Sequence, residues 1–171
     1  MPGKEEGFRF EPLGPAHNRT GFSCGVEALD DYLRKQAGQD VRKRVAVVFV
    51  ITPDGKTIAG YYTLSQYAVE LDTVPDAIAR KLPRYPFVPA TLLGRLAVSK
   101  VFRGQGLGEL LLMDALNRSL IGSRQLASTA VIVDAKDAAA AAFYMKYGFI
   151  ELPNTPNRLF LPMATVENLF S

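Results

Sequence analysis

Three closely spaced glycines, Gly104, Gly106 and Gly108, form the feature that most constrains how this chain folds. They lie between an apolar stretch, 92–98, and a leucine-rich stretch, 109–120, so the pattern predicts a strand, a tight loop and a helix. Glycine adopts positive φ angles and lets the backbone approach a ligand without a Cβ in the way. Because N–H groups at the start of a helix attract anions, this segment predicts a diphosphate site.

The residues around the glycines narrow the choice of diphosphate. No Lys-Ser or Lys-Thr pair follows them, so the loop offers no contact to a γ-phosphate and no hydroxyl to Mg²⁺. Glu109 stands where the dinucleotide fingerprint needs a third glycine, and no acidic ribose ligand follows in the right place. Nucleotide hydrolysis and hydride transfer are therefore disfavoured. A glycine-rich turn that merely begins an ordinary helix is the structural alternative.

Composition places the chain among proteins with one folded domain. Its 171 residues are 48% hydrophobic, which is enough for a substantial core, and we expect a single domain over 1–171. The sequence has no long apolar run and its N-terminus has no apolar signal region, so we expect neither membrane insertion nor secretion. A single cysteine, Cys24, excludes an internal disulfide and favours the reducing cytoplasm.

The rest of the chain alternates predicted strands and helices. Ser23 is expected to cap the first helix, and the stretch 45–51 is expected to be a strand covered on both faces. Pro83, Pro86 and Pro89 predict an extended, irregular connection suited to the substrate side. The predicted strands are 8–11, 45–51, 57–66, 92–98, 129–134, 149–152 and 158–162, the predicted helices are 25–43, 76–81, 107–121 and 137–147, and a turn is predicted at 53–56. This pattern predicts an α/β fold with a mixed sheet and helices on both faces.

Two motifs together resemble a known family. The loop 103–108 reads R-x-x-G-x-G, and Ala140–Phe149 reads A-x-x-F-Y-x-x-x-G-F at the end of a predicted strand–helix unit. Both resemble the GCN5-related N-acetyltransferases (GNAT), in which the loop binds the pyrophosphate of acetyl-CoA. The resemblance implies a GNAT fold, with a mostly antiparallel sheet splayed between its fourth and fifth strands, acetyl-CoA as cosubstrate and no metal.

The resemblance also implies the residues of the site. It places the hydroxyl of Tyr144 next to the thioester sulfur, where it protonates the departing thiolate. A phenol with an ordinary pKa of about 10 is protonated at neutral pH, so this role needs no large shift. Packing in an aromatic core is the alternative role of Tyr144. The implied cofactor-binding residues are Leu96, Ala97, Val98, Arg103, Gly104, Gln105, Gly106, Leu107, Gly108 and Asp134.

The sequence offers no obvious general base. His17 is the only histidine and lies far from both motifs, so we expect it to be structural or exposed, and we expect Cys24 to be a small buried residue. Fewer than about one lysine amine in a thousand is neutral at pH 7, whereas roughly one α-amine in six is neutral. Acetyl transfer without a strong base therefore favours an α-amine acceptor.

Three further segments narrow the resemblance to one branch of the family. Phe22–Leu33, Leu93–Val98 and Leu159–Met163 resemble the acetyltransferase toxins of bacterial toxin–antitoxin pairs. Those toxins acetylate the α-amine of aminoacyl-tRNA and so block translation. The resemblance implies a homodimer, a ribbon-helix-helix antitoxin, and contact with operator DNA only through the antitoxin complex. An acetyltransferase for a protein N-terminus or a small amine, and a CoA-holding partner or DNA-complex module without turnover, are the alternatives.

Basic residues are grouped in a way that suits a polyanion. The net charge is only +3, but the pI is near 9.0 and most of the candidates fall in two clusters. A solvated helix face is the ordinary explanation for such clusters. For Arg95, an internal ion pair is the alternative to a contact with a tRNA phosphate. The candidate contacts to tRNA phosphates are Arg34, Lys35, Arg42, Lys43, Arg44, Arg80, Lys81, Arg84 and Arg95.

Overall fold

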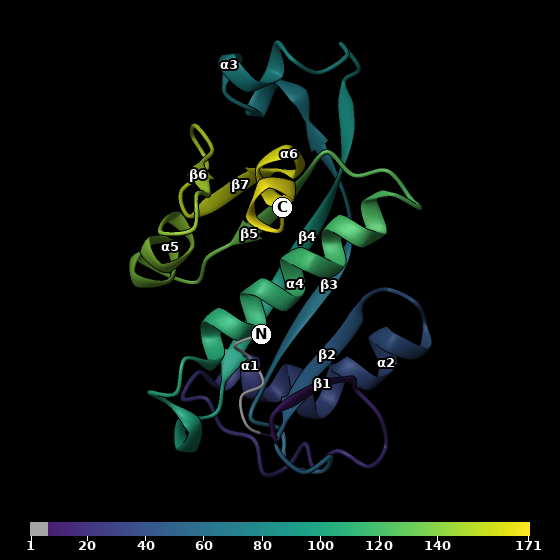
Figure 1. The fold of residues 1–171 in the computed structure, drawn as a ribbon, viewed down its shortest axis with the longest axis vertical. Coiled ribbons are helices and arrows are strands. Elements are labelled where there is room, and N and C mark those ends of the chain that lie inside the picture. The colour runs from purple at the N-terminus through teal and green to yellow at the C-terminus, as the bar shows by residue number, and fades with distance from the viewer. Residues whose placement is uncertain (1–6) are drawn as a thin grey trace. The chain divides into compact units, whose positions relative to one another are not determined.

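The computed structural model describes residues 7–171, which form two compact units (Figure 1). The first unit contains the residues up to Ser65 together with Gly94–Ala115, and the second contains Gln66–Leu93 together with Leu116–Ser171. The prediction that the N-terminus has no apolar signal region falls partly on residues 1–6, and these residues lie outside the described part of the chain. No helix in the described part of the chain is long and apolar enough to span a bilayer.

The strands form one open, mixed sheet in the order β1-β2-β3-β4-β5-β7-β6. The elements are β1 (Arg9–Pro12), α1 (Glu27–Asp31), the π-helical turn η2 (Tyr32–Gln36), α2 (Ala37–Arg42), β2 (Val47–Thr52), β3 (Gly60–Glu70), the 3₁₀ turn η3 (Leu71–Thr73), α3 (Asp76–Ala79), β4 (Phe87–Val98), the 3₁₀ turn η4 (Lys100–Phe102), α4 (Leu107–Ser123), β5 (Ala130–Asp134), α5 (Ala138–Met145), β6 (Ile150–Glu151), β7 (Arg158–Pro162) and α6 (Met163–Leu169). The pairs β1–β2, β2–β3, β5–β7 and β6–β7 are antiparallel, whereas β4–β5 is parallel. A parallel pair needs a crossover, and α4 supplies it. The predicted α/β fold with a mixed sheet is confirmed.

The hairpin β2–β3 of the first unit confirms the predicted turn. The Asp54 carboxylate accepts hydrogen bonds from the N–H groups of Lys56 (2.9 Å) and Thr57 (2.7 Å), and these bonds lower the pKa of Asp54 to about 2. The strand predicted at 45–51, which corresponds to β2, was expected to be covered on both faces. This prediction was wrong at the start of the strand. Val45 precedes β2 and Val47 begins it, and both side chains are exposed.

Alternation along β3 places helices on both faces of the sheet in the first unit. Successive strand residues point to opposite faces, and both Tyr61 and Tyr62 are fully buried. The Tyr61 hydroxyl donates to the carbonyl oxygen of Leu29 in α1 (2.7 Å), while the Tyr62 hydroxyl donates to Asp114 of α4 (2.6 Å). The predicted covering of the sheet on both faces is therefore confirmed here for β3.

The first helix begins later than the sequence predicted, and Ser23 does not cap it. Gly25 has a φ of +92°, which breaks the helical path before α1 begins at Glu27. The Asp30 carboxylate, inside the first turn, accepts a hydrogen bond from the Cys24 N–H (2.9 Å). The start of α1 is therefore fixed by the side chain of Asp30, which follows it in the sequence, and not by Ser23, which precedes it.

The second unit packs around β5, β7 and the first half of β4. Ala130 and Ile132 of β5 are fully buried with Val88 of β4 and Phe160 of β7. The continuous apolar run of β5 reflects this burial on both faces. The C-terminal helix α6, whose Val166 is fully buried, was not predicted.

The connection between β3 and β4 lies in the second unit and agrees largely with prediction. A short helix, α3, occupies part of the predicted range 76–81, and an irregular stretch follows it. Pro89 was expected in the irregular stretch but lies inside β4. It has no N–H to donate, yet its carbonyl oxygen accepts from both the N–H and the hydroxyl of Thr129 (2.8 Å each).

Candidate active site

The glycine loop of the first unit is open to solvent and has the predicted backbone conformation. Gly104 and Gly106 have φ angles of +82° and +75°, a region that side chains with a Cβ rarely adopt. A Cβ built on either glycine meets no other atom within 4 Å, so the space beside this backbone is free. α4 begins directly afterwards at the buried Leu107. The loop and the unpaired N–H groups of the helix start therefore fit a diphosphate.

Arg103 fixes the loop to the segment that precedes α1. Its Nη2 donates a hydrogen bond to the carbonyl oxygen of Cys24 (2.7 Å). The backbone N–H of Lys100 donates to the carbonyl oxygen of Ser23 (2.8 Å). The arginine of the motif is thus engaged within the first unit, where it braces the loop that we expect to contact the cofactor.

β4 leads into this loop and carries the residues expected to contact the pantetheine arm. Ala97 is buried in the core of the first unit, whereas Leu96 and Val98 are half-buried. The neighbouring Arg95 places its guanidinium carbon 3.6 Å from the centroid of the Tyr32 ring. This distance defines a close cation–π contact, so Arg95 is engaged with an aromatic ring inside the first unit.

Tyr32 links Arg95 to the second helix of the first unit. Its hydroxyl donates a hydrogen bond to the Asp40 carboxylate (2.7 Å). Burial, followed by this hydrogen bond to Asp40, raises the pKa of Tyr32 well above its ordinary value. Arg95, Tyr32 and Asp40 thus form a chain of contacts that ties β4 to the helical turns η2 and α2.

Tyr144 lies on α5 in the second unit, and its side chain is buried. The residue exposes only 7% of its surface and packs edge-on against Phe143 (5.2 Å between centroids) and Phe149 (5.5 Å). Among residues 7–171 its hydroxyl has no hydrogen-bond partner, and burial alone raises the pKa of Tyr144. A buried hydroxyl without a partner is costly, which suggests that its partner is a ligand.

The ends of α5 hold Tyr144 in place along the chain. Asp137 caps the helix, since its carboxylate accepts from the Ala140 N–H (2.8 Å). Gly148, with a φ of +101°, ends the turn that follows the helix. The predicted helix with a glycine stop is confirmed.

Asp134, at the end of β5, is held by an arginine that sequence reasoning missed. Arg158 donates Nε to Oδ1 (2.7 Å) and Nη2 to Oδ2 (2.8 Å) of Asp134, and Nη1 donates to the Tyr67 hydroxyl. The two carboxylate hydrogen bonds are the main reason why the pKa of Arg158 is raised. Only the register of β5 with β7, in which Asp134 faces Arg158, could have indicated this pair. The cofactor-binding role of Asp134 stays a prediction.

His17 is structural, as predicted. It is buried, its Nδ1 accepts a hydrogen bond from the Gly14 N–H (3.0 Å), and its Nε2 lies 2.8 Å from Glu11 Oε1. The bond to Nδ1 places the ring proton on Nε2, which donates to Glu11 and lowers the pKa of that carboxyl. Cys24 is also buried, as expected. Within 7–171, no group of three or more His, Cys, Asp and Glu side chains is placed to hold a metal ion.

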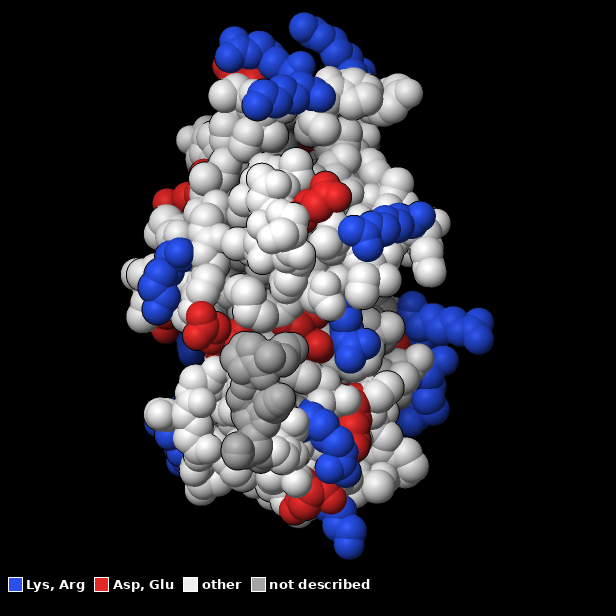
Figure 2. Space-filling view, viewed as in Figure 1, with Lys and Arg blue, Asp and Glu red and all other residues white. Residues whose placement is uncertain are grey.

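The two basic clusters belong to different units. In the first unit, Arg34 and Lys35 both pair with Asp31 (2.9 and 3.7 Å), which offsets part of their charge. In the second unit, Arg80, Lys81 and Arg84 follow the start of α3, and Figure 2 shows Lys and Arg side chains gathered around α3. Contact of either cluster with phosphates stays a prediction.

The glycine loop before α4 and the β5–α5 unit together define a class of protein. Comparison of the sequence with known families identifies that class. The family described as "Acetyltransferase (GNAT) domain" matches residues 44–151. This match covers more than half of the chain, so the chain belongs to the GNAT family of acetyltransferases.

Two curated relatives align with nearly the whole chain. A "tRNA-acetylating toxin" of Mycobacterium tuberculosis (strain ATCC 25618 / H37Rv) is 36% identical over 157 residues, covering 92% of this chain and 93% of the relative. A "Probable toxin TacT" of Sinorhizobium fredii (strain NBRC 101917 / NGR234) is 32% identical over 168 residues, 93% of each chain. The match therefore extends beyond the acetyltransferase region itself.

Solved structures of similar proteins include several complexes. AtaT complexed with acetyl-methionyl-tRNAfMet has a TM-score of 0.88 and 29% identity, covering 96% of this chain and 99% of that one. A mutant of AtaT bound to the C-terminus of the antitoxin AtaR and acetyl-CoA has a TM-score of 0.81 and 25% identity (96% and 99%). The KacTA–DNA complex has a TM-score of 0.79 and 30% identity (95% and 98%).

Proposed function

We propose that this protein is a toxin that transfers the acetyl group of acetyl-CoA to the α-amine of aminoacyl-tRNA and so blocks translation. The observation that carries the acetyl-transfer chemistry is the buried Tyr144 hydroxyl, which has no hydrogen-bond partner among the described residues. The choice of aminoacyl-tRNA is supported by the relative called a tRNA-acetylating toxin and by the similarity to AtaT in complex with acetyl-methionyl-tRNAfMet.

The first unit carries the groups that fit acetyl-CoA. The open backbone at Gly104 and Gly106, followed by the start of α4, suits the pyrophosphate. The main-chain groups of Leu96, Ala97 and Val98 on β4 suit the pantetheine arm and the thioester carbonyl. When bound, acetyl-CoA supplies the acetyl group as a reactive thioester. Arg103 keeps the loop in position through its bond to the Cys24 carbonyl.

Tyr144 acts as the proton donor in this proposal. Because burial raises its pKa above the ordinary value of about 10, the phenol keeps its proton throughout the neutral pH range. A protonated hydroxyl without a protein partner can donate to an anionic sulfur as negative charge develops there. The aromatic packing against Phe143 and Phe149 limits the directions in which that hydroxyl can point.

The acceptor follows from the groups that the protein offers. His17 is bound to Glu11 and Gly14 and Cys24 is buried, so neither serves as a general base. An α-amine with a pKa near 7.7 is neutral often enough at pH 7 to attack without such help. The basic residues of both units supply the charge that a polyanionic carrier of this amine requires.

The assembly and location of the protein follow the same reasoning. We propose a homodimer, one acetyltransferase domain over the whole chain, a cytoplasmic location and a ribbon-helix-helix antitoxin that brings operator DNA to the complex. The structures of AtaT with AtaR and of KacTA with DNA support the last two partners. The alignment of the relatives with over nine tenths of the chain supports one domain.

Labelled acetyl-CoA tests the proposal directly. The purified protein is incubated with total aminoacyl-tRNA, with the same tRNA after deacylation, and with free amino acids. We expect label only in the first reaction, and alkaline hydrolysis of the product should release N-acetyl amino acids. Equal label in deacylated tRNA would exclude the α-amine as the acceptor. Efficient labelling of peptides or free amino acids instead of aminoacyl-tRNA would favour a protein N-terminus or a small amine.

A further inference from the structure

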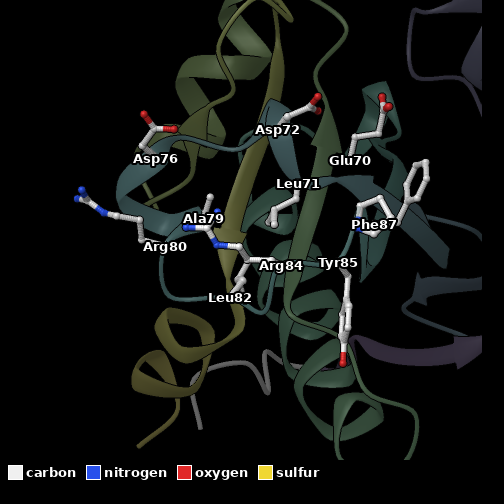
Figure 3. Close-up of a pocket in the computed structure, with 11 residues that line it drawn as sticks. Glu70, Leu71, Asp72, Asp76, Ala79, Arg80, Leu82, Arg84, Tyr85 and Phe87 are labelled. Carbon is white, nitrogen blue, oxygen red and sulfur yellow. The ribbon is translucent and has the colours of Figure 1, made fainter.

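Two adjoining pockets lie in the second unit, apart from the residues assigned so far to the cofactor. The larger has a volume of about 600 Å³, which is in the range of small-molecule sites. The smaller, of about 370 Å³, shares the lining residues Glu70 and Phe87 with the larger, so the two pockets are neighbours at these residues. The larger pocket is lined by Glu70, Leu71, Asp72, Asp76, Ala79, Arg80, Leu82, Arg84, Tyr85, Pro86 and Phe87 (Figure 3).

Exposed aromatic rings mark the larger pocket. Tyr85 is 63% exposed and Phe87 is 52% exposed, on either side of Pro86. Aromatic rings that line a pocket and yet face solvent are typical of binding sites rather than of a core. In Figure 3 the Phe87 ring lies on the side of Glu70, whereas the Tyr85 ring points the other way, with its hydroxyl away from Leu71. Both rings are therefore available to a ligand with a flat face.

The charges of the larger pocket are separated. Arg84 extends toward Ala79 of α3, whereas the carboxylates of Glu70 and Asp72 point away from α3 (Figure 3). Arg80 and Arg84 thus give the α3 side a positive charge, to which Lys81 adds. Asp76 is the acidic residue on α3 itself. A negatively charged backbone would be attracted to the α3 side and repelled from Glu70 and Asp72.

One wall of the smaller pocket is formed by β5, the strand that precedes the helix of Tyr144. Its lining includes Tyr67, Ile132 and Arg158. Arg158 holds Asp134, the last residue of β5, and the chain continues from there through Asp137 into α5. The pocket combines apolar walls with the polar pair of Tyr67 and Arg158, as a site for an amino-acid side chain requires.

Together these features point to a single-stranded nucleic acid that ends in an amino acid. Aromatic rings combined with arginines bind single strands, because every base can stack on a ring and every phosphate carries a charge. Resting on the proposed function, we propose that the two pockets hold the unpaired 3′ end of aminoacyl-tRNA. Its bases stack on Tyr85 and Phe87, its phosphates contact Arg80 and Arg84, and its amino acid enters the smaller pocket.

Removing each ring tests this proposal. We expect Tyr85→Ala and Phe87→Ala each to lower kcat/KM for aminoacyl-tRNA by roughly 5- to 150-fold, the range of one base stacked on one ring. Tyr85→Phe should retain nearly full activity, because stacking needs only the ring. Phe170→Ala removes another exposed aromatic side chain of the second unit and serves as the matched control.

Two binding assays separate this proposal from the proposed function. We expect both alanine variants to bind acetyl-CoA, which does not reach these rings in our proposal, with a Kd within twofold of the wild type by calorimetry. We also expect them to bind a labelled single-stranded RNA ending in CCA more weakly by fluorescence anisotropy. Failure of the wild type to acetylate aminoacyl-tRNA would refute the proposed function alone. If the wild type acetylates aminoacyl-tRNA and both variants do so with unchanged kinetics and unchanged RNA binding, the stacking role is overturned. A loss of acetyl-CoA binding as large as the loss of activity would overturn it as well.

Discussion

Replacing Tyr144 by phenylalanine removes one hydroxyl from a buried ring and leaves the aromatic packing in place. The ring keeps its edge-on contacts with Phe143 and Phe149, which are made by carbon atoms that both residues share. The change therefore separates the two roles that the sequence left open for Tyr144, namely proton donation and core packing.

The expected effects on activity and on stability differ in direction. General acid catalysis contributes typically about 10²- to 10⁴-fold, so the loss of the hydroxyl should raise the activation free energy by about 3 to 5 kcal/mol. Because the hydroxyl is buried and has no partner among residues 7–171, its removal should leave the free energy of unfolding unchanged or raise it by up to about 2 kcal/mol. A residue that only stabilised the core through its hydroxyl would behave in the opposite way.

Single-turnover acetylation of aminoacyl-tRNA and chemical denaturation measure the two quantities. Tyr147→Phe removes the hydroxyl of a half-buried tyrosine that follows the same helix and is the matched control, with activity expected near that of the wild type. Acetyl-CoA binding by calorimetry checks that the variant still holds its cosubstrate. Activity of Tyr144→Phe within threefold of the wild type, or a fall of more than about 1 kcal/mol in its stability, would refute the reasoning.

Three other predictions concern the loop, the pH profile and the basic residues. Gly106→Ala forces a residue with a Cβ to a φ of +75°, which costs about 1–2 kcal/mol. KM for acetyl-CoA should therefore rise at least about fivefold. Gly122→Ala, within α4, is the control and should leave KM unchanged. The acetylation rate should rise about tenfold per pH unit below the α-amine pKa of about 7.7. It should then stay level to about pH 10, because the raised pKa of Tyr144 keeps the phenol protonated. A decline of the rate between pH 8 and 10 would contradict the role of Tyr144 as proton donor. Arg84→Ala should reduce the salt slope of tRNA binding by about 1. Arg95→Ala should leave that slope unchanged but destabilise the fold by about 0.5–2 kcal/mol through the lost contact with Tyr32. Chemical denaturation measures the stability, and salt titration of tRNA binding measures the slope. A reduced slope for Arg95→Ala would instead identify Arg95 as a phosphate contact.

Local patterns in the sequence determined the elements whose causes are local. The turn around Asp54 and the positive φ angles of Gly104 and Gly106 follow from the preferences of short stretches, and each was predicted correctly. The same holds for the apolar strand β5 and for α5 between Asp137 and Gly148. Hydrogen bonds and steric limits within a few residues decide such features, so tertiary contacts are not needed to foresee them.

Only the tertiary structure decided which polar side chains meet. Tyr67 and Arg158 are 91 residues apart in the chain, and their contact depends on the order of the strands in the sheet. The sequence left a phosphate contact and an internal ion pair open for Arg95, whereas in the structure Arg95 stacks on Tyr32 because β4 and η2 meet within the first unit. The position of a side chain on a strand can be inferred from a period of two residues, whereas its partner depends on which strand or helix lies beside it, and that neighbour is set by long-range packing.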